Sequence, residues 1–396
     1  MLMHVFPAAP WLKRRHILML AGGATVTACA PHARGAHNAT PDMSGVDRRL
    51  QQAVAAGEAP GVVCAIGHGQ QIVHRAVYGR RALTPAAEPM TWDTVFDMAS
   101  LTKAVITAPC VMQLWEQGRF GLDDPVSRYL PQFAATGKST ITIRHLLTHY
   151  SGLPPDLDLE HPWQGREAAF RLAMGVAPSQ PPGRGFIYSD INFITLGFVV
   201  EKLSGMTLDA YATRFILTPL GMRQSRFLPP QTWQPRIAPT QPDENGHMLR
   251  GQVHDPSARR MGGVAGHAGL FSNADDMCLY AQALLDRRAG RPSAYPLQSK
   301  TLMLMTTAQQ PGGKSDLRGL GWDISTHYSS VRGDSFPVGS FGHTGFTGTS
   351  LWLDPGSDSY VLILTSRLHP AGRGNVVRLR HDVATAAALA LLPPQG

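Results

Sequence analysis

Strand-like segments lie near both ends of this 396-residue sequence, and the long stretch between them is patterned for helices. Residues 61–69 and 71–79 are short runs rich in apolar and β-branched side chains, each ending in glycine. Residues 342–353 and 359–367 form a second pair, joined by the turn sequence DPGSDS. Between about residues 100 and 300, apolar side chains recur mainly with helical spacing. The pattern indicates that distant parts of the chain share one sheet.

Helical patterns accompany both pairs of strands, over residues 46–57 and 376–392. We therefore predict an α/β (α+β) fold, in which an antiparallel sheet formed from both chain ends is flanked by helices. A mostly helical subdomain would be inserted at about residues 120–300, within one domain spanning 46–396. The hydrophobic content of 43% is sufficient for a sizeable core.

The N-terminus resembles an export signal rather than part of the fold. Residues 1–28 combine a basic segment with a short apolar stretch and then small residues, and the apolar stretch is too short for a permanent membrane span. VTAC (26–29) resembles a lipobox, in which Cys29 would receive a lipid. We expect a periplasmic protein anchored to a membrane through Cys29, with a tether over 29–45. A cleaved secretory signal with an incidental Cys29 is the alternative.

The charge and the cysteines exclude several classes of function. The net charge is +8, but the arginines are spread thinly, and even the densest spots are pairs such as Arg259-Arg260. Without a basic stripe interleaved with aromatic residues, we predict no nucleic-acid partner. Cys64, Cys110 and Cys278 lack metal-site spacing and are interpreted as buried free thiols. We predict neither a metal nor a cofactor.

Ser100 and Lys103 open a helical pattern that ends at Gly118. Residues three apart share a helix face, so the hydroxyl and the amine would be neighbours. A serine at a helix start gains the positive end of the helix dipole, and a lysine, unlike an arginine, can lose its proton when desolvated. The sequence has only six lysines, which makes this one notable. Taken alone, the spacing is explained better by an N-cap serine with an exposed lysine. Pro109 should divide the helix.

Two further segments carry side chains suited to catalysis. In YSDIN (188–192), Ser189 or Asp190 would cap the following helix and leave Tyr188 just outside it. A tyrosine base at neutral pH needs its pKa lowered by about 3 units, and Lys103 could supply the charge. In GHTGFTGTS (342–350), the glycines indicate either a close backbone approach to a ligand or a bulged strand. An edge strand here could offer an N–H to an oxyanion.

Together, these three segments resemble the motifs of the serine β-lactamase/penicillin-binding protein superfamily. They are Ser100-x-x-Lys103, the triplet 188–190 and the triplet 343–345. Tyrosine in the second motif is similar to the class C β-lactamase branch, which includes esterases and D,D-peptidases. The stretches LDDPVSRYLP, ITIRHLLTHYSGLP and GQVHDPSARRMGGVAGHAGLFSNADD extend the resemblance from about residue 46 to the end.

The resemblance implies a role for each matching residue. Ser100 would be the acylated nucleophile, and Lys103 would take or share its proton. Tyr188 would act as the base and then protonate the leaving group. The N–H groups of Ser100 and Phe346 would bind the oxyanion. The implied substrate-binding and oxyanion set is Asp190, His343, Thr344, Gly345 and Phe346.

Two positions depart from the β-lactamases of this branch. Asp190 stands where they have asparagine, and a carboxylate beside Lys103 should keep the lysine charged, which moves the base role to Tyr188. His343 stands where they have lysine, and a largely neutral histidine should bind a substrate carboxylate less firmly. His-Thr-Gly is nevertheless found among the family members that are not β-lactamases.

Other patterns are interpreted as structural. His145 and His149 have the spacing of a zinc helix but lack the glutamate of H-E-x-x-H. The stretch GGVAGHAG (262–269) lacks the strand-turn-helix context of a nucleotide loop, and we interpret it as a loop beside the cleft with His267 unassigned.

The sequence thus favours an exported serine hydrolase acting through an acyl-enzyme on Ser100. A D,D-carboxypeptidase or endopeptidase for peptidoglycan peptides is the leading expectation, with an esterase of small acyl esters as the alternative. A true β-lactamase and a non-catalytic envelope lipoprotein are weaker hypotheses. The oligomeric state cannot be inferred.

Overall fold

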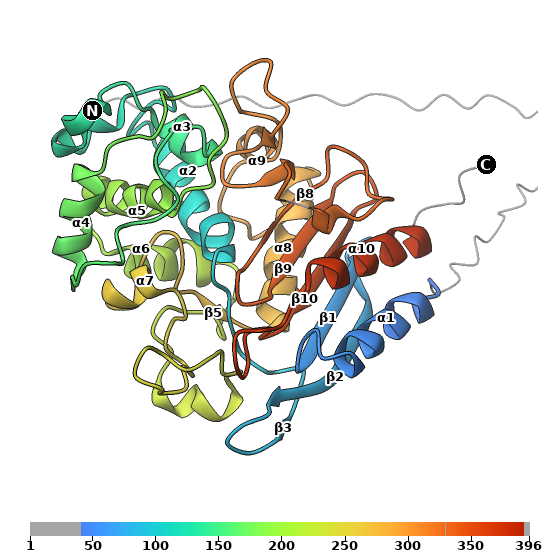
Figure 1. Ribbon diagram of the computed structural model, residues 1–396. Coiled ribbons are helices and arrows are strands. Elements are labelled where there is room, and N and C mark those ends of the chain that lie inside the picture. The colour runs from blue at the N-terminus through green and yellow to red at the C-terminus, as the bar shows by residue number, and fades with distance from the viewer. Residues whose placement is uncertain (1–40, 329, 392–396) are drawn as a thin grey trace, which may run out of the picture. The chain divides into compact units, whose positions relative to one another are not determined.

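The structure is a computed structural model that describes residues 41–328 and 330–391 (Figure 1). The predicted signal peptide and Cys29 therefore lie outside the described residues, as does most of the predicted tether. The first helix begins at Ser44, two residues before the predicted start.

An eight-stranded antiparallel sheet forms the centre of the fold, with the order β3-β2-β1-β10-β9-β8-β7-β6 (Figure 1). Strands from both ends of the chain meet in its middle, where β1 pairs with β10 and Val63 lies opposite Leu364. The predicted fold class is confirmed. The strands are β1 Gly61–His68, β2 Gln71–Ala82, β3 Glu88–Pro89, β6 Leu317–Arg318, β7 Asp323–Ser325, β8 Phe341–Thr344, β9 Ser350–Asp354 and β10 Ser359–Leu364, with a separate two-stranded sheet of β4 Phe96–Asp97 and β5 Phe271–Ser272.

Helices cover both faces of the large sheet. The terminal helices α1 and α10 pack side by side on one face, and α8 packs against β1 and β10 on the other (Figure 1). The α-helices are α1 Ser44–Ala55, α2 Ala108–Glu116, α3 Ile143–Thr148, α4 Arg166–Gly175, α5 Asp190–Ser204, α6 Leu208–Ala212, α7 Pro256–Arg260, α8 Ala274–Arg288, α9 Ser299–Met305 and α10 Val377–Leu391. Shorter π or 3-10 segments are η1 Lys103–Thr107, η2 Val126–Arg128, η3 Pro131–Gly137, η4 Thr213–Leu217, η5 Gln231–Arg236 and η6 Ser330–Arg332.

Two hydrophobic cores lie on opposite sides of the sheet. Strand β1 serves both, because side chains alternate along a strand: Val63 and Ala65 enter the larger core, and Val62 and Ile66 enter the core beneath α1 and α10. The cysteine interpretation is confirmed, because Cys64, Cys110 and Cys278 are all buried and free. The structure thus carries its thiols as small hydrophobic side chains.

The helix after β4 changes type at the position that proline predicts. It begins as the π-helical segment η1 and continues as α2 from Ala108, with Pro109 in the first turn of α2. Thr107, which precedes α2, is itself helical, so Pro109 lies inside a continuous helix, and its missing N–H removes one hydrogen bond where the helix changes from π to α. Within the described residues, no single helix is long and apolar enough to cross a membrane. One bent pair of helical segments, Asp190–Ser204 with Leu208–Leu217, has the length and the composition of a membrane span, and these two criteria alone select it.

Candidate active site

Ser100 follows a tight turn between β4 and the helix that begins with η1. Ala99 has a φ of 46°, in the left-handed region that residues with a side chain seldom adopt. The buried carboxylate of Asp97 holds this turn by accepting hydrogen bonds from the N–H groups of Ala99 (2.8 Å) and His254 (2.7 Å). Lys103 N donates to Ser100 O at 3.1 Å, which closes the first helical turn. The serine hydroxyl is thereby fixed at the helix start, as predicted.

Lys103 lies directly beside this hydroxyl and is fully buried. Its Nζ donates to Ser100 Oγ at 2.8 Å and to His267 O at 3.2 Å, and it pairs with Asp190 Oδ1 at 2.7 Å. Burial lowers the pKa of Lys103, but the nearby Asp190 and Tyr188 raise it by more, so the net pKa lies above its usual 10.5. The expectation that Asp190 keeps the lysine charged is confirmed.

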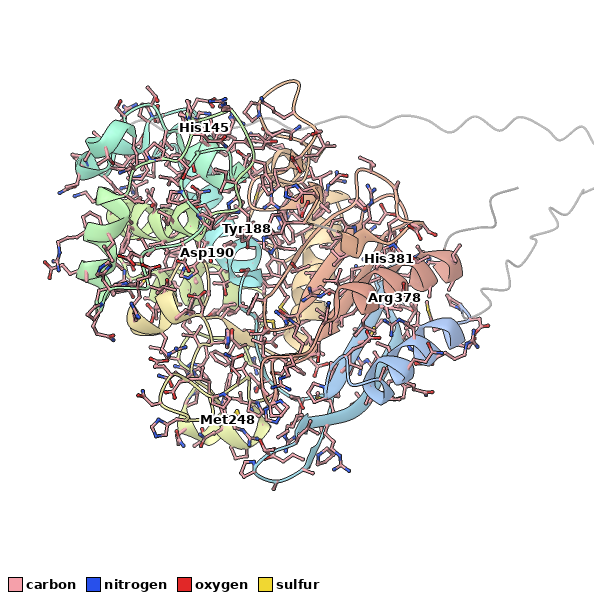
Figure 2. All side chains as sticks on the ribbon, in the orientation of Figure 1. His145, Tyr188, Asp190, Met248, Arg378 and His381 are labelled. Atoms are coloured by element: carbon pink, nitrogen blue, oxygen red, sulfur yellow. The ribbon has the colours of Figure 1, made fainter. Side chains whose placement is uncertain are left out.

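Tyr188 stands at the end of the loop before α5, where the helical part of the molecule meets the sheet (Figure 2). Its ring stacks on His149, with centroids 4.5 Å apart, and on Tyr328 at 5.6 Å. Lys103 Nζ lies 5.0 Å from the ring centroid. Burial nevertheless raises the pKa of Tyr188 above 10, and the lysine charge only partly opposes this. The expected lowering towards neutrality was wrong, and the resting side chain is a phenol.

His149 fixes the position of the Tyr188 ring. Its Nδ1 accepts from Ser189 N and from Asn192 Nδ2, each at 3.1 Å, so the ring proton resides on Nε2. Burial and the charges of Arg318 and Lys103 hold the pKa of His149 well below 6.5. The sequence pattern gave no hint of this contact, because it joins α3 to the loop before α5.

The strand β8 brings a second backbone segment to Ser100. A Cβ on Gly345 would collide with Thr349 Oγ1 and Met98 O, which explains why the third motif ends in glycine. Thr349 Oγ1 and Thr347 Oγ1 donate to Met98 O (3.1 Å) and Asp97 O (2.7 Å), fastening the β8–β9 loop to the turn that precedes Ser100.

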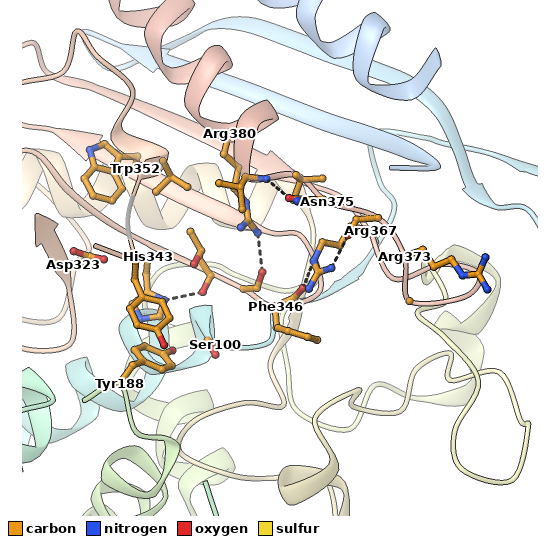
Figure 3. A pocket seen from close by; sticks show the side chains of 18 of the residues that line it. Ser100, Tyr188, Asp323, His343, Phe346, Trp352, Arg367, Arg373, Asn375 and Arg380 are labelled. Atoms are coloured by element: carbon orange, nitrogen blue, oxygen red, sulfur yellow. Dashed lines mark hydrogen bonds between the residues drawn. The ribbon is translucent and has the colours of Figure 1, made fainter. Parts of the chain in front are cut away.

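Two backbone N–H groups lie at this junction. Among the described residues, no group accepts a hydrogen bond from the N–H of Ser100 or of Phe346. Both residues line one cavity, and Figure 3 shows Ser100 between Tyr188 and Phe346. Free N–H donors beside a nucleophile are what an oxyanion hole requires.

The cavity has a volume of about 540 Å³ and combines the three sequence motifs. Its lining contains four arginines that the sequence analysis did not single out. Its lining includes Ser100, Tyr188, Arg318, Asp323, Tyr328, His343, Thr344, Gly345, Phe346, Trp352, Arg367, Arg373, Asn375 and Arg380 (Figure 3). Lys103 and Asp190 lie outside this lining, and Asp190 contacts the lysine.

His343 is buried and neutral, as expected. Burial and the charges of Arg318 and Lys103 hold its pKa well below 6.5. Its Nδ1 lies 2.9 Å from Thr344 O and therefore carries the proton, whereas Nε2 has no partner among the described residues. The third motif thus carries an uncharged nitrogen acceptor.

A buried charge cluster lies beneath the nucleophile. His267 Nε2 lies 2.7 Å from Asp255 Oδ1, and Asp255 also accepts from Ala258 N at 2.8 Å. Burial lowers the pKa of His267, but Asp255 and Asp190 raise it above 6.5, so this histidine is the cationic partner of Asp255. The sequence analysis left His267 unassigned.

Within the described part of the chain, one group of side chains in this cluster could hold a metal ion. Ligand atoms of Asp190, Asp255 and His267 lie within 4.8 Å of one another. Their charges are already balanced, because Lys103 pairs with Asp190 and His267 with Asp255. This donor set does not favour an added divalent cation, since a protonated histidine cannot be a ligand.

The remaining histidine set aside in the sequence analysis has a structural role. His145 Nδ1 accepts from Thr142 N at 3.2 Å, and Thr142 Oγ1 accepts from His145 N at 3.2 Å, so the pair forms a capping box at the start of α3.

The fold and this serine-lysine-tyrosine arrangement define a class, the β-lactamase/transpeptidase-like serine hydrolases. The family model described as Beta-lactamase matches residues 46–386. The chain belongs to this family.

Two relatives span most of the chain. A Bacillus subtilis (strain 168) protein named N-acetylmuramyl-L-alanine amidase is 31% identical over 374 residues, covering 85% of this chain and 84% of the relative. An Escherichia coli (strain K12) protein provisionally named D-alanyl-D-alanine carboxypeptidase is 30% identical over 363 residues, covering 83% of this chain and 82% of the relative.

Solved structures share the fold at lower identity. The hydrolase EstCE1, described as having promiscuous acyltransferase activity, has a TM-score of 0.70 at 24% identity and covers 87% of this chain and 97% of its own. A penicillin-binding protein homologue from Caulobacter crescentus has a TM-score of 0.71 at 20% identity and covers 89% of this chain and 98% of its own.

Proposed function

We propose that this serine hydrolase is an exported D,D-carboxypeptidase or endopeptidase that cleaves peptidoglycan peptides through an acyl-enzyme on Ser100. The observation that carries the proposal is the 2.8 Å contact between Lys103 Nζ and Ser100 Oγ, beside Tyr188 and two free N–H groups. The names of the two relatives denote hydrolysis of amide bonds, which supports a peptide substrate. Action in the periplasm, with Cys29 as a lipid anchor, belongs to the same proposal.

In acylation, Ser100 Oγ attacks the carbonyl carbon of the scissile bond. The carbonyl oxygen becomes an oxyanion held by the N–H groups of Ser100 and Phe346. The serine proton moves to the Tyr188 oxygen, and the phenolic proton passes to the leaving nitrogen, so tyrosine ends the step as it began. The carbonyl–nitrogen bond breaks and the amine departs. This relay suits a tyrosine whose pKa is above 10, because no resting phenolate is needed.

The charged Lys103 lowers the cost of this transfer without giving up its own proton. Its ammonium donates to Ser100 Oγ and lies against the Tyr188 ring, so it stabilises negative charge on either oxygen. In deacylation, water takes the place of the amine. Its proton returns through Tyr188 to Ser100 Oγ as the acyl–oxygen bond breaks and a carboxylic acid is released.

An esterase remains the second candidate because of His343. A neutral side chain in place of lysine lowers the requirement for an anionic substrate at this strand. An ester also needs less help from a proton donor than an amide, since an alkoxide leaves far more readily than an amine nitrogen that has not been protonated.

Intact-mass spectrometry can test the proposal. The protein would be incubated separately with a penicillin, an activated ester and diacetyl-L-Lys-D-Ala-D-Ala, with Ser100→Ala as the control. We expect a penicillin adduct that depends on Ser100, together with release of D-alanine from the peptide. Turnover of the ester without any peptide cleavage would favour the esterase. Equal labelling of the Ser100→Ala variant would refute Ser100 as the nucleophile.

A further inference from the structure

Arg318 is a buried cation that lines the cavity from the edge of the sheet. It ends the two-residue strand β6, and its side chain is only 1% exposed. Its charged partner is Asp323, with Nη1 3.5 Å from Oδ2, which is longer than a good charge-assisted hydrogen bond. Among the described residues, neither Nε nor Nη2 has a hydrogen-bond partner. A buried guanidinium with free donors is costly unless something else satisfies it.

The other arginines of the cavity donate to backbone carbonyls or are exposed. Arg380 Nη2 donates to Gly345 O and Thr349 O, each at 2.8 Å. Arg367 Nε donates to the carbonyl of Phe346 at 2.7 Å, and its Nη1 donates to another backbone carbonyl. Arg373 is exposed to solvent. Arg380 also has an Nε without a partner, but two backbone carbonyls hold its Nη2, whereas among the described residues the Arg318 side chain makes only the 3.5 Å polar contact with Asp323.

The charges around the cavity favour an anion. Its described lining contains four arginines against the single carboxylate of Asp323, and His343 is neutral. The positive field that a lysine in the third motif would have supplied thus comes from a different strand. It is supplied by the planar guanidinium of Arg318, whose parallel N–H groups can pair with the two oxygens of a carboxylate.

Arg318 lies on the Tyr188 side of the cavity. Its guanidinium carbon is 5.7 Å from the Phe186 ring, and Phe186 contacts His149, the residue on which Tyr188 stacks. In the reaction proposed above, Tyr188 protonates the leaving atom, so the leaving group must occupy this side. An anion bound by Arg318 would therefore belong to the leaving group and not to the acyl group.

We propose that Arg318 binds a carboxylate carried by the leaving group, so that the preferred substrates release an amine or alcohol that bears a free carboxylate. The inference rests on the proposed acyl-transfer function and narrows it to a substrate class. A C-terminal amino acid is the simplest peptide leaving group of this kind. Arg318 on β6 then supplies the positive charge that a lysine at position 343 would have provided. The neutral His343 is therefore compatible with a carboxypeptidase.

Matched substrates can test this inference without knowledge of the natural one. The first pair is diacetyl-L-Lys-D-Ala-D-Ala and its C-terminal amide. The second pair is 4-acetoxybenzoate and 4-acetoxybenzamide, whose leaving phenols differ in the same charge, with rates corrected for uncatalysed hydrolysis. For the wild-type protein, we expect kcat/KM to favour the carboxylate member by at least about tenfold.

The variant Arg318→Gln should lose this preference. We expect kcat/KM for the carboxylate substrates to fall by about 10–100-fold, whereas the neutral member of each pair changes less than about threefold. Arg171→Gln, which removes an exposed arginine on α4, is the matched control and should keep the wild-type ratio. Arg318→Lys should restore part of the preference, because it keeps the charge but loses the fork.

Each outcome decides one of the two proposals. Equal wild-type rates within both pairs, or an unchanged ratio in Arg318→Gln, would overturn the role of Arg318 and leave the serine hydrolase intact. Cleavage of the acetoxy esters without the peptides would refute the peptidase and still decide the inference. If Arg318→Gln does not fold, as judged by its thermal melt, the wild-type ratios and Arg318→Lys decide the matter.

Discussion

Lys103 Nζ donates to Ser100 Oγ and His267 O and forms an ion pair with Asp190 Oδ1, so its ammonium is directed at three oxygens. This geometry differs from that of a lysine acting as a base, which would need a lone pair directed at the serine. A buried lysine on its own would lose its proton, so its charge depends on the adjacent carboxylate. The chemistry of the site therefore depends on Asp190, a residue that does not line the cavity.

The variant Asp190→Asn tests this dependence. Without the carboxylate, burial should bring the pKa of Lys103 down, and the alkaline limit of acylation should move to lower pH. The measurement is the rate of Ser100 acylation by an activated ester between pH 6 and 10, with Asp93→Asn, an exposed site, as control. If neutral Lys103 were the base, the variant would instead become faster near neutral pH.

The variant Tyr188→Phe removes the hydroxyl and keeps the ring, so it tests the catalytic role of the hydroxyl separately from the packing of the ring. The stack on His149 would remain, so we expect the free energy of unfolding to change by less than about 1 kcal/mol. Loss of the proton relay should lower kcat about 10²–10⁴-fold. Urea denaturation and steady-state kinetics on the same preparation check both values. A fall in kcat below threefold would show that another group carries the proton.

At the scale of elements, the site forms where three segments are fastened together. The turn after β4 holds Ser100, the loop before α5 holds Tyr188, and the end of β8 supplies the 343–345 triplet. The helix α10 takes part through Arg380, which donates to the carbonyls of Gly345 and Thr349. Small displacements between these elements should therefore affect catalysis more than stability.

The variant Gly345→Ala tests the close approach of β8 to the turn before Ser100. The added methyl group would meet Thr349 and Met98, so the strand end must move. We expect a loss of about 1–3 kcal/mol in the free energy of unfolding and at least a tenfold fall in the acylation rate. Gly312→Ala is the control, because nothing lies within 4 Å of a Cβ there. Normal acylation in Gly345→Ala would contradict this account of the oxyanion site.

Long-range contacts set the limit on what sequence reasoning could predict. The fold class followed from strand patterns at both ends, and the three motifs led directly to Ser100, Tyr188 and His343. Arg318 was not identified as a site residue, because β6 has two residues and is too short to show any periodicity. The roles of His149 and His267 were not predicted, because their partners are far away in sequence and are brought near only by packing. The Tyr188 pKa was misjudged because burial cannot be weighed against charge before the fold is known.

At the scale of the whole molecule, buried carboxylates make stability depend on pH. Burial and the charges of Asp255 and Asp190 raise the pKa of Asp156 from 3.8 to about 6. Between these values the unfolded chain gives up this proton while the folded chain keeps it, so stability falls as pH rises. The penalty is complete above about pH 6.

The variant Asp156→Asn should remove this contribution. Its amide oxygen can still accept from Ser257 Oγ, which lies 2.9 Å from the carboxylate. Relative to wild type, we expect the variant to gain about 2–3 kcal/mol in the free energy of unfolding between pH 4 and 7. Urea denaturation at several pH values measures the gain, with Asp93→Asn again as the control. A difference that does not change with pH would contradict the raised pKa.

The pairing of β1 with β10 has a consequence for how the chain acquires its structure. Val63 and Leu364 are about 300 positions apart, so β1 lacks its inner neighbour until almost the whole chain has been synthesised. Until then β1 exposes an apolar, unpaired edge that can join another chain. The protein should therefore fold late and in one step, and chains cut short before Ser359 should aggregate rather than form a smaller stable domain.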